Sequence, residues 1–461
     1  MMQYKKSYYF IKGNVLVGGK YEIIYSTLSN KLYALDQQIG GLIEEGLFEQ
    51  IPENILNKLV EDKFIRLSET NELQEHITVN KQAIDNDSYT LYQSIQPSAN
   101  CQLGCSYCGQ SHNKKTMGIF QEEAILSRVV HNLTKKEYKA LGICWFGGEP
   151  LMGIKSIRSL SNRFQELCSD QQLDYSAKIV TNGLSLKREI FFDLLLNHKV
   201  DEFEITLDGT ATYHDQRRHT KEGNHTFDII LNNLKSIVND ERFAQHKPTL
   251  IIRSNIDKNN YESITELVEL LEQENIFKYA KFYLAPIHSW GNDAHFTSLS
   301  DTEFADIELE MKLQLLAKGY PIQFVPGQQK NIVCMSLKDN AELFDAEGNL
   351  FNCSEVSQVP VYENNNNQHR IAQYTHTSNE VIDETFRPFS NWNDTILNGE
   401  VPCSKCKILP ICGGQCPKLW NEGIQACPSV KFNFPDRIVA QFYANNMLDA
   451  NKNEMSYLSI G

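Results

Sequence analysis

Three closely spaced cysteines constrain this chain more than any other feature. Cys101, Cys105 and Cys108 form a C-x₃-C-x₂-C pattern, with Tyr107 directly before the last cysteine. The pattern supplies three thiolates on one short loop, which is one too few for a closed tetrahedral zinc site. Three thiolates suit a [4Fe–4S] cube whose remaining iron is open to another ligand. A zinc loop that takes its fourth ligand from elsewhere in the chain is the alternative.

Short apolar runs closed by turn residues follow the cysteines. They read ICWFGGEP at 143–150, AKIVTNG at 177–183 and EITLDG at 204–209, and segments of helical character lie between them. This alternation is typical of β/α units around a parallel sheet or barrel, with ligand-binding residues at the strand ends. The Asn-Gly and Asp-Gly pairs, taken singly, are ordinary turn signals.

In this order after the cysteines, the runs resemble the radical S-adenosylmethionine (radical SAM) superfamily, over about residues 90 to 300. The resemblance implies that Cys101, Cys105 and Cys108 hold the cluster, whose open iron chelates the amino and carboxylate groups of SAM. It places Tyr107 against the adenine, where ordinary core packing is the alternative. The other SAM contacts that it implies are Gly147, Gly148, Glu149, Pro150, Asn182, Thr206, Asp208 and Arg218.

Three of these contacts have more specific implied roles. The Gly147-to-Pro150 segment is expected to bind the SAM amino group, because glycine permits close backbone approach. Thr206 is expected beside the ribose or carboxylate. Arg218 is expected to clamp the carboxylate with its guanidinium fork, although its neighbour Arg217 leaves the register open by one residue. A solvated surface charge is the alternative for Arg218.

A second cysteine block lies in the last third of the chain and resembles the SPASM extension of radical SAM enzymes that mature peptides and proteins. The resemblance implies two auxiliary iron–sulfur clusters. Cluster I would be held by Cys334, Cys353 and Cys416, and cluster II by Cys403, Cys406, Cys412 and Cys427. No eighth cysteine is evident for cluster I, so it is expected to have an open iron or another ligand. A double zinc ribbon is the alternative.

Whole-chain properties limit the setting of this chemistry. Of 12 cysteines, ten fall in the two blocks, and Cys144 and Cys168 are interpreted as small buried hydrophobic residues. Clustered cysteines favour metal binding in a reducing cytoplasm over a disulfide framework. A formal net charge of −14 argues against a nucleic-acid partner. The sequence shows neither a membrane span nor a secretory signal.

The predicted fold class is α/β: a partial (β/α)₆ TIM-like radical SAM barrel between two further domains. Strand-like runs at 21–25 and 31–35 and a helical pattern after Pro52 give the start of the chain a winged-helix-like order. A closing helix is expected from Asp436, and the polar run at 363–368 is interpreted as a solvated loop. The expected domains are 1–85 (winged-helix-like, with possible leader-peptide recognition), 90–300 (radical SAM core), 301–330 (bridging helix), 331–435 (SPASM) and 436–461 (helix and tail).

The resemblance implies a peptide maturase with three [4Fe–4S] clusters. Reductive cleavage of SAM would give a 5′-deoxyadenosyl radical, which takes a hydrogen atom from a residue of a ribosomally made precursor peptide. A thioether, ether or carbon–carbon cross-link, or an oxidised residue, would result. The expected partners are that precursor and an external low-potential electron donor of flavodoxin or ferredoxin type. A sulfatase-maturing enzyme that forms formylglycine and a non-catalytic iron–sulfur or zinc module are the alternatives, and no general base can be named.

Overall fold

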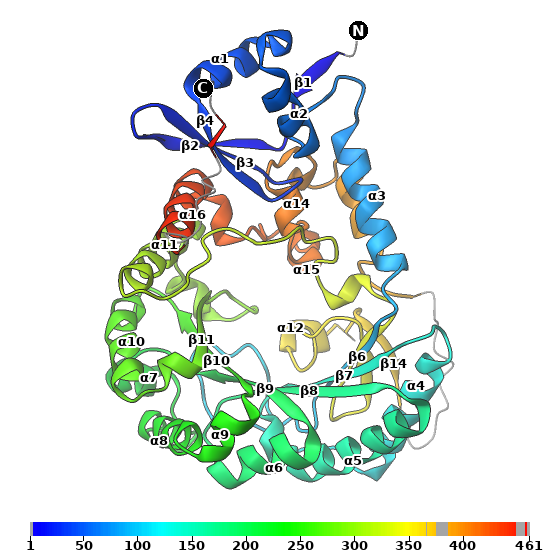
Figure 1. Ribbon diagram of the computed structural model, residues 1–461. Coiled ribbons are helices and arrows are strands. Elements are labelled where there is room, and N and C mark those ends of the chain that lie inside the picture. The colour runs from blue at the N-terminus through cyan, green and yellow to red at the C-terminus, as the bar shows by residue number, and fades with distance from the viewer. Residues whose placement is uncertain (1–2, 366, 375–385, 449–456, 459–461) are drawn as a thin grey trace. The chain divides into compact units, whose positions relative to one another are not determined.

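The computed structural model describes residues 3–365, 367–374, 386–448 and 457–458 (Figure 1). They form two compact units. As far as its residues are described, the first unit is built from Met1–Asn86, Ser300–Leu337 and Phe389–Gly461. The second is built from Asp87–Leu299 and Lys338–Pro388. The chain therefore contributes three separate segments to the first unit and two to the second.

A nine-stranded sheet organises the second unit, in the order β11-β10-β9-β8-β7-β6-β12-β13-β14. Six of its strands are neighbours in chain order, and all are parallel. This run confirms the expected α/β fold with a sheet rich in parallel strands. The six are β6 (Thr90–Ile95), β7 (Ala140–Trp145), β8 (Asp174–Thr181), β9 (Val200–Thr206), β10 (Thr249–Ile256) and β11 (Ala280–Pro286).

Helices between these strands line one face of the parallel run (Figure 1). They are α4 (Ile119–Leu133), α5 (Ile154–Gln171), α6 (Arg188–His198), α7 (Ala211–Arg217), α8 (Phe227–Val238), α9 (Glu241–His246) and α10 (Ile264–Gln273). In α5 the buried residues Ile157, Leu160 and Phe164 recur at helical spacing and form its inner face. Phe203 of β9 stacks on Phe191 of α6, with 4.0 Å between the ring centroids. Alternate residues of each strand therefore face the helices, and the residues between them face away.

Residues 338–388 extend the same sheet. Strand β12 (Ala341–Phe344) pairs with β6 in parallel, and β13 (Asn349–Phe351) and β14 (Arg370–Gln373) continue antiparallel, with α12 (Pro360–Glu363) between them. The interpretation of 363–368 as a solvated loop was wrong for Asn367, which is 1% exposed. Its amide nitrogen donates to the carbonyl of Val356 at 3.0 Å and to Glu363 at 2.8 Å, so this asparagine holds the turn together from inside.

The first unit contains a four-stranded sheet in the order β15-β4-β3-β2. Strands β2 (Phe10–Val17), β3 (Tyr21–Ser26) and β4 (Lys31–Asp36) are antiparallel, and β15 (Tyr457–Leu458) runs parallel to β4. The runs expected at 21–25 and 31–35 are thus strands. A separate ribbon pairs β1 (Tyr4–Lys6) with β5 (Ile65–Leu67).

The longer helices of the first unit are α1 (Gln37–Glu45), α2 (Glu53–Glu61), α3 (Glu72–Asp85), α11 (Asp301–Ala317) and α16 (Phe434–Leu448). Helix α2 follows Pro52 as expected and buries Ile55 and Leu59. Helix α16 begins before Asp436, the residue expected to cap it, and Asp436 lies in its first turn. Pro435 explains the earlier start, because a proline in the first turn gives up no helical hydrogen bond.

Short helices complete the two units. The α-helical ones are α13 (Trp392–Leu397), α14 (Leu409–Cys412) and α15 (Pro417–Asn421). The 3₁₀ turns are η1 (Phe48–Gln50), η2 (Pro150–Gly153), η3 (Tyr261–Ser263), η4 (Phe277–Tyr279), η5 (Asp293–Phe296), η6 (Met335–Leu337), η7 (Pro402–Lys405) and η8 (Ser429–Lys431). Among the described residues, no helix combines the length and apolar character that crossing a bilayer requires.

The hydrophobic cores of the first unit join the start of the chain to its end. In one core Tyr25 packs with Phe434, and Cys412 belongs to the same cluster. In another, Tyr9 and Ile77 share a cluster with Cys403. The N-terminal residues are therefore part of the scaffold around the second cysteine block.

Candidate functional site

The loop of Cys101, Cys105 and Cys108 lies in the second unit, and its three cysteines are not disulfide-bonded. Backbone hydrogen bonds hold one side of the loop, because Gly104 and Ser106 donate to the carbonyls of His219 and Arg217 at 2.9 and 3.0 Å. On another side, the Asn292 side chain donates to the carbonyls of Tyr107 at 3.3 Å and Cys108 at 3.2 Å. Asn292 belongs to no motif, and sequence reasoning missed it.

The glycine pair after β7 fits closely against the cysteine loop. A Cβ atom on Gly148 would lie 3.0 Å from the carbonyl oxygen of Asn100 and 2.9 Å from the His112 ring. Gly147 has a φ of +108°, a backbone conformation that side chains disfavour. His112 also reaches Cys108, with 3.5 Å between Nε2 and the sulfur. The segment that carries the three cysteines therefore occupies, through Asn100 and His112, the space that a side chain at Gly148 would need.

Glu149 clamps two strand ends together. Its carboxylate is fully buried and accepts hydrogen bonds from the backbone of Asn182 at 2.8 Å, the hydroxyl of Thr181 at 2.7 Å and the backbone of Leu151 at 3.0 Å. Burial raises the pKa of this carboxyl, while the three donors oppose that effect. The clamp joins the end of β7 to the end of β8, and Pro150 begins η2 immediately after it.

The next two sequence-predicted residues lie at the ends of β8 and β9. Asn182 is buried, and its side-chain nitrogen lies 3.7 Å from the sulfur of Cys101. Its side-chain oxygen accepts from the backbone of Leu184 at 2.9 Å, which fixes the amide orientation. Thr206 is the last residue of β9 and is 8% exposed. The strand ends therefore gather around the cysteine loop, as the motif order indicates.

A buried hydrogen-bond network surrounds the Tyr107 hydroxyl. The hydroxyl donates to Asp208 at 2.5 Å, and it accepts from Arg218 at 2.6 Å and from Asn255 at 3.0 Å. Asp208 is fully buried and also accepts from the backbone of Asn255 at 2.8 Å. His214 orients the same loop, because its Nδ1 accepts a hydrogen bond from the backbone nitrogen of Asp208 at 3.2 Å. Burial, followed by the charges of the two neighbouring arginines, lowers the pKa of His214 and keeps the ring neutral.

Two adjacent arginines, both 6% exposed, lie next to Tyr107. The Arg217 guanidinium lies over the Tyr107 ring at 4.9 Å from the centroid and forms an ion pair with Asp257 at 2.9 Å. Within the described residues, Nε and Nη2 of Arg217 and Nε of Arg218 have no hydrogen-bond partner. Spare buried guanidinium donors fit the carboxylate of a ligand such as SAM. Both arginines are therefore candidates for the role assigned to Arg218.

The face of the parallel run opposite the helices carries a polar group that sequence reasoning missed. Glu204 of β9 accepts from the Tyr283 hydroxyl at 2.9 Å and lies 3.9 Å from the Arg253 guanidinium. Arg253 and Tyr283 are paired residues of β10 and β11. Alternation with the buried Phe203 and Ile205 could have indicated this face, because Glu204 lies between them.

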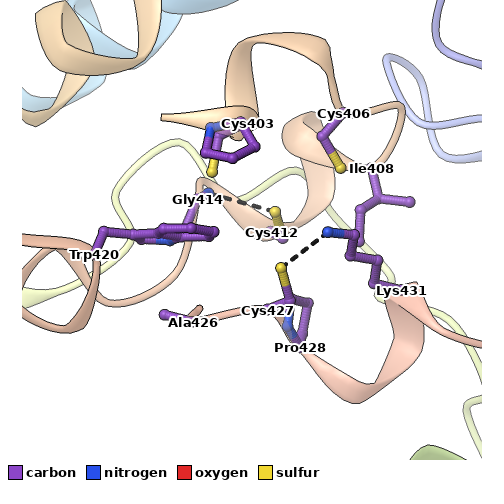
Figure 2. A pocket seen from close by; sticks show the side chains of 11 residues that line it. Cys403, Cys406, Ile408, Cys412, Gly414, Trp420, Ala426, Cys427, Pro428 and Lys431 are labelled. Carbon is purple, nitrogen blue, oxygen red and sulfur yellow. Dashed lines mark hydrogen bonds between the residues drawn. The ribbon is translucent and has the colours of Figure 1, made fainter. Parts of the chain in front are cut away.

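Four cysteines of the first unit line one pocket. Cys403, Cys406, Cys412 and Cys427 come from η7, α14 and the segment before η8, and Figure 2 shows their sulfur atoms directed toward a common space. Burial raises the pKa of Cys403 and of Cys412 to about 12, so without a metal these thiols are neutral. Four converging thiols are a donor set that fits an iron–sulfur cluster.

Two features support this pocket. Lys431 donates to the sulfur of Cys427 at 3.0 Å (Figure 2), and such a cation stabilises a thiolate. The Gly413-Gly414 turn has positive φ at both residues, and the indole nitrogens of Trp392 and Trp420 donate to its two carbonyls at 3.0 and 2.9 Å. Lys431 follows Cys427 by four residues, a spacing that carries no motif.

The remaining cysteines are placed individually. Cys334 and Cys416 belong to the first unit, where the sulfur of Cys334 lies 2.8 Å from the Ser336 hydroxyl and Cys416 precedes α15. Cys353 is buried in the second unit. Cys144 and Cys168 are buried, as expected.

Across the described residues, no three His, Cys, Asp or Glu side chains form a group that could hold a single metal ion. A [4Fe–4S] cube binds its thiolates through different irons, so its ligands need not meet at one point.

Comparisons with known proteins agree with this site. Residues 95–271 match the model of the radical SAM superfamily. The chain is 23% identical over 391 residues to a cysteine-type anaerobic sulfatase-maturating enzyme of Clostridium novyi, covering 78% of this chain and 98% of that protein. It is 24% identical over 241 residues to the radical SAM cyclopropyl synthase TigE of Paramaledivibacter caminithermalis, covering 48% of each. The solved structure of anSMEcpe with bound AdoMet aligns with a TM-score of 0.58 and 18% identity, over 79% of this chain and 96% of that one.

Fold and site together define an α/β enzyme whose cysteine loop lies at the ends of parallel strands. The matched segment contains the whole loop and the strands from β7 to β10. The chain therefore carries a radical SAM domain, which implies S-adenosylmethionine and a [4Fe–4S] cluster. It resembles the SPASM-type maturases.

Proposed function

We propose that this protein is a radical SAM/SPASM peptide maturase that modifies a residue of a ribosomally made precursor peptide. The observation that carries the proposal is the four-thiol pocket of Cys403, Cys406, Cys412 and Cys427, in addition to the three-thiol loop of the SAM site. An enzyme that only cleaved SAM would need one cluster, whereas oxidation of a substrate radical needs a second electron acceptor. The peptide product is a cross-link or an oxidised residue.

In the SAM site, Cys101, Cys105 and Cys108 would hold a [4Fe–4S] cluster, which when bound would supply the electron for reductive cleavage of SAM. Arg217 and Arg218 offer their spare donors to the SAM carboxylate, and Asp208 and Asp257 balance the charge of the two guanidiniums. The Tyr107 ring, fixed through its hydroxyl, provides a flat surface for the adenine.

On the helix-free face, Glu204, Arg253 and Tyr283 form the substrate contact surface. The Arg253 and Tyr283 side chains are partly exposed, whereas Leu250, Ile252 and Ser254 on the other face of β10 are buried. Charged and hydroxyl groups of this kind hydrogen-bond a peptide backbone and hold the target carbon still. Apolar strands around them keep water from the radical.

The domain assignment belongs to the same proposal. Residues 1–85 form a winged-helix-like region that recognises the leader part of the precursor, and residues 331–435 form the SPASM region with clusters I and II. Cys334, Cys353 and Cys416 would hold cluster I, and with three cysteines one iron would be left for a substrate thiolate or another ligand. A similar solved structure supports a peptide substrate, because it shows anSMEcpe with a Cp18Cys peptide bound. An external flavodoxin or ferredoxin delivers the electron.

The experiment begins with anaerobic reconstitution of the full chain. We expect about twelve irons per chain, in three clusters of four. Addition of SAM and a low-potential reductant should yield 5′-deoxyadenosine, and a co-expressed precursor peptide should lose a pair of hydrogen atoms by mass spectrometry. Stoichiometric zinc with iron near zero would overturn the proposal.

A sulfatase-maturing activity is the second candidate. The similarity to the Clostridium novyi enzyme over 98% of its length favours it. Such an enzyme converts one cysteine or serine of a protein to an aldehyde. Incubation with a peptide that carries a single cysteine separates the two functions, because an aldehyde reacts with a hydrazine probe and a cross-link does not.

A further inference from the structure

The outer edge of β4 is covered by the end of the chain itself. Residues Tyr457 and Leu458 form β15, which pairs in parallel with Ala34 and Leu35 of β4. In Figure 1 this short red strand lies beside β4 in the first unit. Without β15, β4 would be the edge of an antiparallel sheet in the order β4-β3-β2. An uncovered edge presents unpaired backbone groups and invites another strand.

The two tail residues enter different cores. The Tyr457 ring lies with its centroid 4.8 Å from that of Tyr21 and 5.8 Å from that of Phe442, on one face of the sheet. Leu458 packs on the other face, against the cluster that contains Ile39 and Ile55. Successive residues of a strand point to opposite faces, so the edge accepts an aromatic side chain followed by an aliphatic one. These are side-chain pockets at a strand-addition edge.

The described residues of the tail pair with two residues of this edge. Strand β4 has six residues, all of them paired with β3, but only two pair with β15. In the described part of the chain, the outer side of Lys31, Leu32 and Tyr33 has no strand partner. An extended peptide that pairs along the whole of β4 forms more ladder hydrogen bonds than the two residues of β15 do.

We propose that β15 is a displaceable strand, which occupies the β4 edge in competition with the peptide substrate. The identity of the competitor rests on the proposed function, whereas the displaceable strand itself does not. Because the tail belongs to the same chain, it competes intramolecularly and weakens the binding of any free peptide to this edge. A peptide that presents an aromatic and an aliphatic residue in succession displaces it and gains the remaining length of β4.

The test uses a fluorescein-labelled synthetic peptide with the sequence of residues 449–461 and a chain truncated after Leu448. Fluorescence anisotropy should show saturable binding to the truncated chain and binding at least about tenfold weaker to the full chain. A peptide in which both Tyr457 and Leu458 are replaced by Ala should not bind. The full chain with Met447→Ala, whose side chain is 64% exposed on α16, is the matched control and should behave as the full chain does.

A second variant guards against a folding defect in the truncated chain. The full-length Tyr457→Ala/Leu458→Ala chain keeps its length but weakens β15, and it should also bind the labelled peptide. Circular dichroism and iron content check both variants. Equal binding to the full and truncated chains, or binding to neither opened variant, would overturn the proposal. If the enzyme modifies no precursor peptide, the proposed function is wrong, but the anisotropy result for the displaceable strand still stands.

Discussion

The hydroxyl of Tyr107 donates a hydrogen bond of 2.5 Å to the carboxylate of Asp208 in the interior of the SAM site. The two residues lie 101 positions apart, one in the cysteine loop and the other after β9. Arg218 donates to the same hydroxyl at 2.6 Å, so this one oxygen joins an anion and a cation. Hydrogen bonds therefore tie the cysteine loop to the loop after β9.

Replacing Tyr107 with Phe should reduce SAM cleavage about tenfold or more without loss of iron. Removal of the hydroxyl leaves buried donors and an acceptor unpaired, at a cost of about 1–3 kcal/mol. The measurement is 5′-deoxyadenosine formation under a fixed excess of reductant, with iron content determined on the same sample. Tyr279→Phe, on a half-exposed ring of η4, is the control. An unchanged rate in Tyr107→Phe would show that the network has no part in SAM cleavage.

The two groups of cysteines should lose iron independently. Replacing Cys101, Cys105 and Cys108 with Ala should remove about four irons per chain and abolish SAM cleavage. Replacing Cys403, Cys406, Cys412 and Cys427 should remove about four others, and the SAM cluster spectrum should persist because these ligands lie in the other unit. Cys168→Ala, at a buried position of α5, should leave the iron content unchanged. Loss of all iron from either group of substitutions would contradict independent sites.

The polar group on the helix-free face should control how efficiently SAM cleavage is used. In Glu204→Gln the carboxylate charge opposite Arg253 is lost while the side-chain shape remains. We expect the ratio of modified peptide to 5′-deoxyadenosine to fall about tenfold, because the peptide is held less rigidly. Mass spectrometry and chromatography of one reaction give both quantities. Glu269→Gln on the exposed side of α10 is the matched control. An unchanged ratio would mean that the peptide binds elsewhere.

Acid should destabilise the first unit through His76. Burial lowers the pKa of His76 from 6.5 to about 4 in the folded protein. Between these values only the unfolded chain takes up the proton, so stability is present above pH 6.5 and is lost as pH falls toward 4. By roughly pH 5.5 the loss is about 1 kcal/mol. The unfolding temperature of the wild type should fall between neutral pH and pH 5.5 by more than that of His76→Phe, as thermal circular dichroism can measure. Parallel curves for the two proteins would contradict the assignment.

The sequence predicted the strand ends well, for a physical reason. Apolar runs such as ICWF and AKIV are short and are closed by turn residues, which favours buried strands over helices and marks the edge where a ligand can bind. The resemblance to the SPASM extension grouped Cys403, Cys406, Cys412 and Cys427, and these four cysteines line one pocket.

Residues that act singly across long distances could not be predicted. Asn292 tethers the cysteine loop, Asn255 completes the Tyr107 network and Lys431 faces Cys427, yet each is one polar residue without a pattern. The pairing of β12 with β6 was equally hidden, because a four-residue strand carries too little information to select its neighbour. That Arg217 and Arg218 are both buried beside Tyr107, with Arg217 paired to Asp257, is likewise revealed only by the folded chain.

The first unit is built from three separate chain segments, and this determines the order in which the protein can fold during synthesis. During synthesis Tyr25 emerges long before Phe434, its core partner, and Tyr9 and Ile77 emerge long before Trp392. Ribosomal elongation delivers domains from the N-terminus, so the second unit has all the strands of its parallel run while the first still lacks its last segment. Until then, the face of β2, β3 and β4 that packs against α16 has no permanent cover. The cell must therefore protect a nascent chain whose early strands wait for residues about 400 positions later, and iron can enter the four-cysteine pocket only after Cys427 has been made.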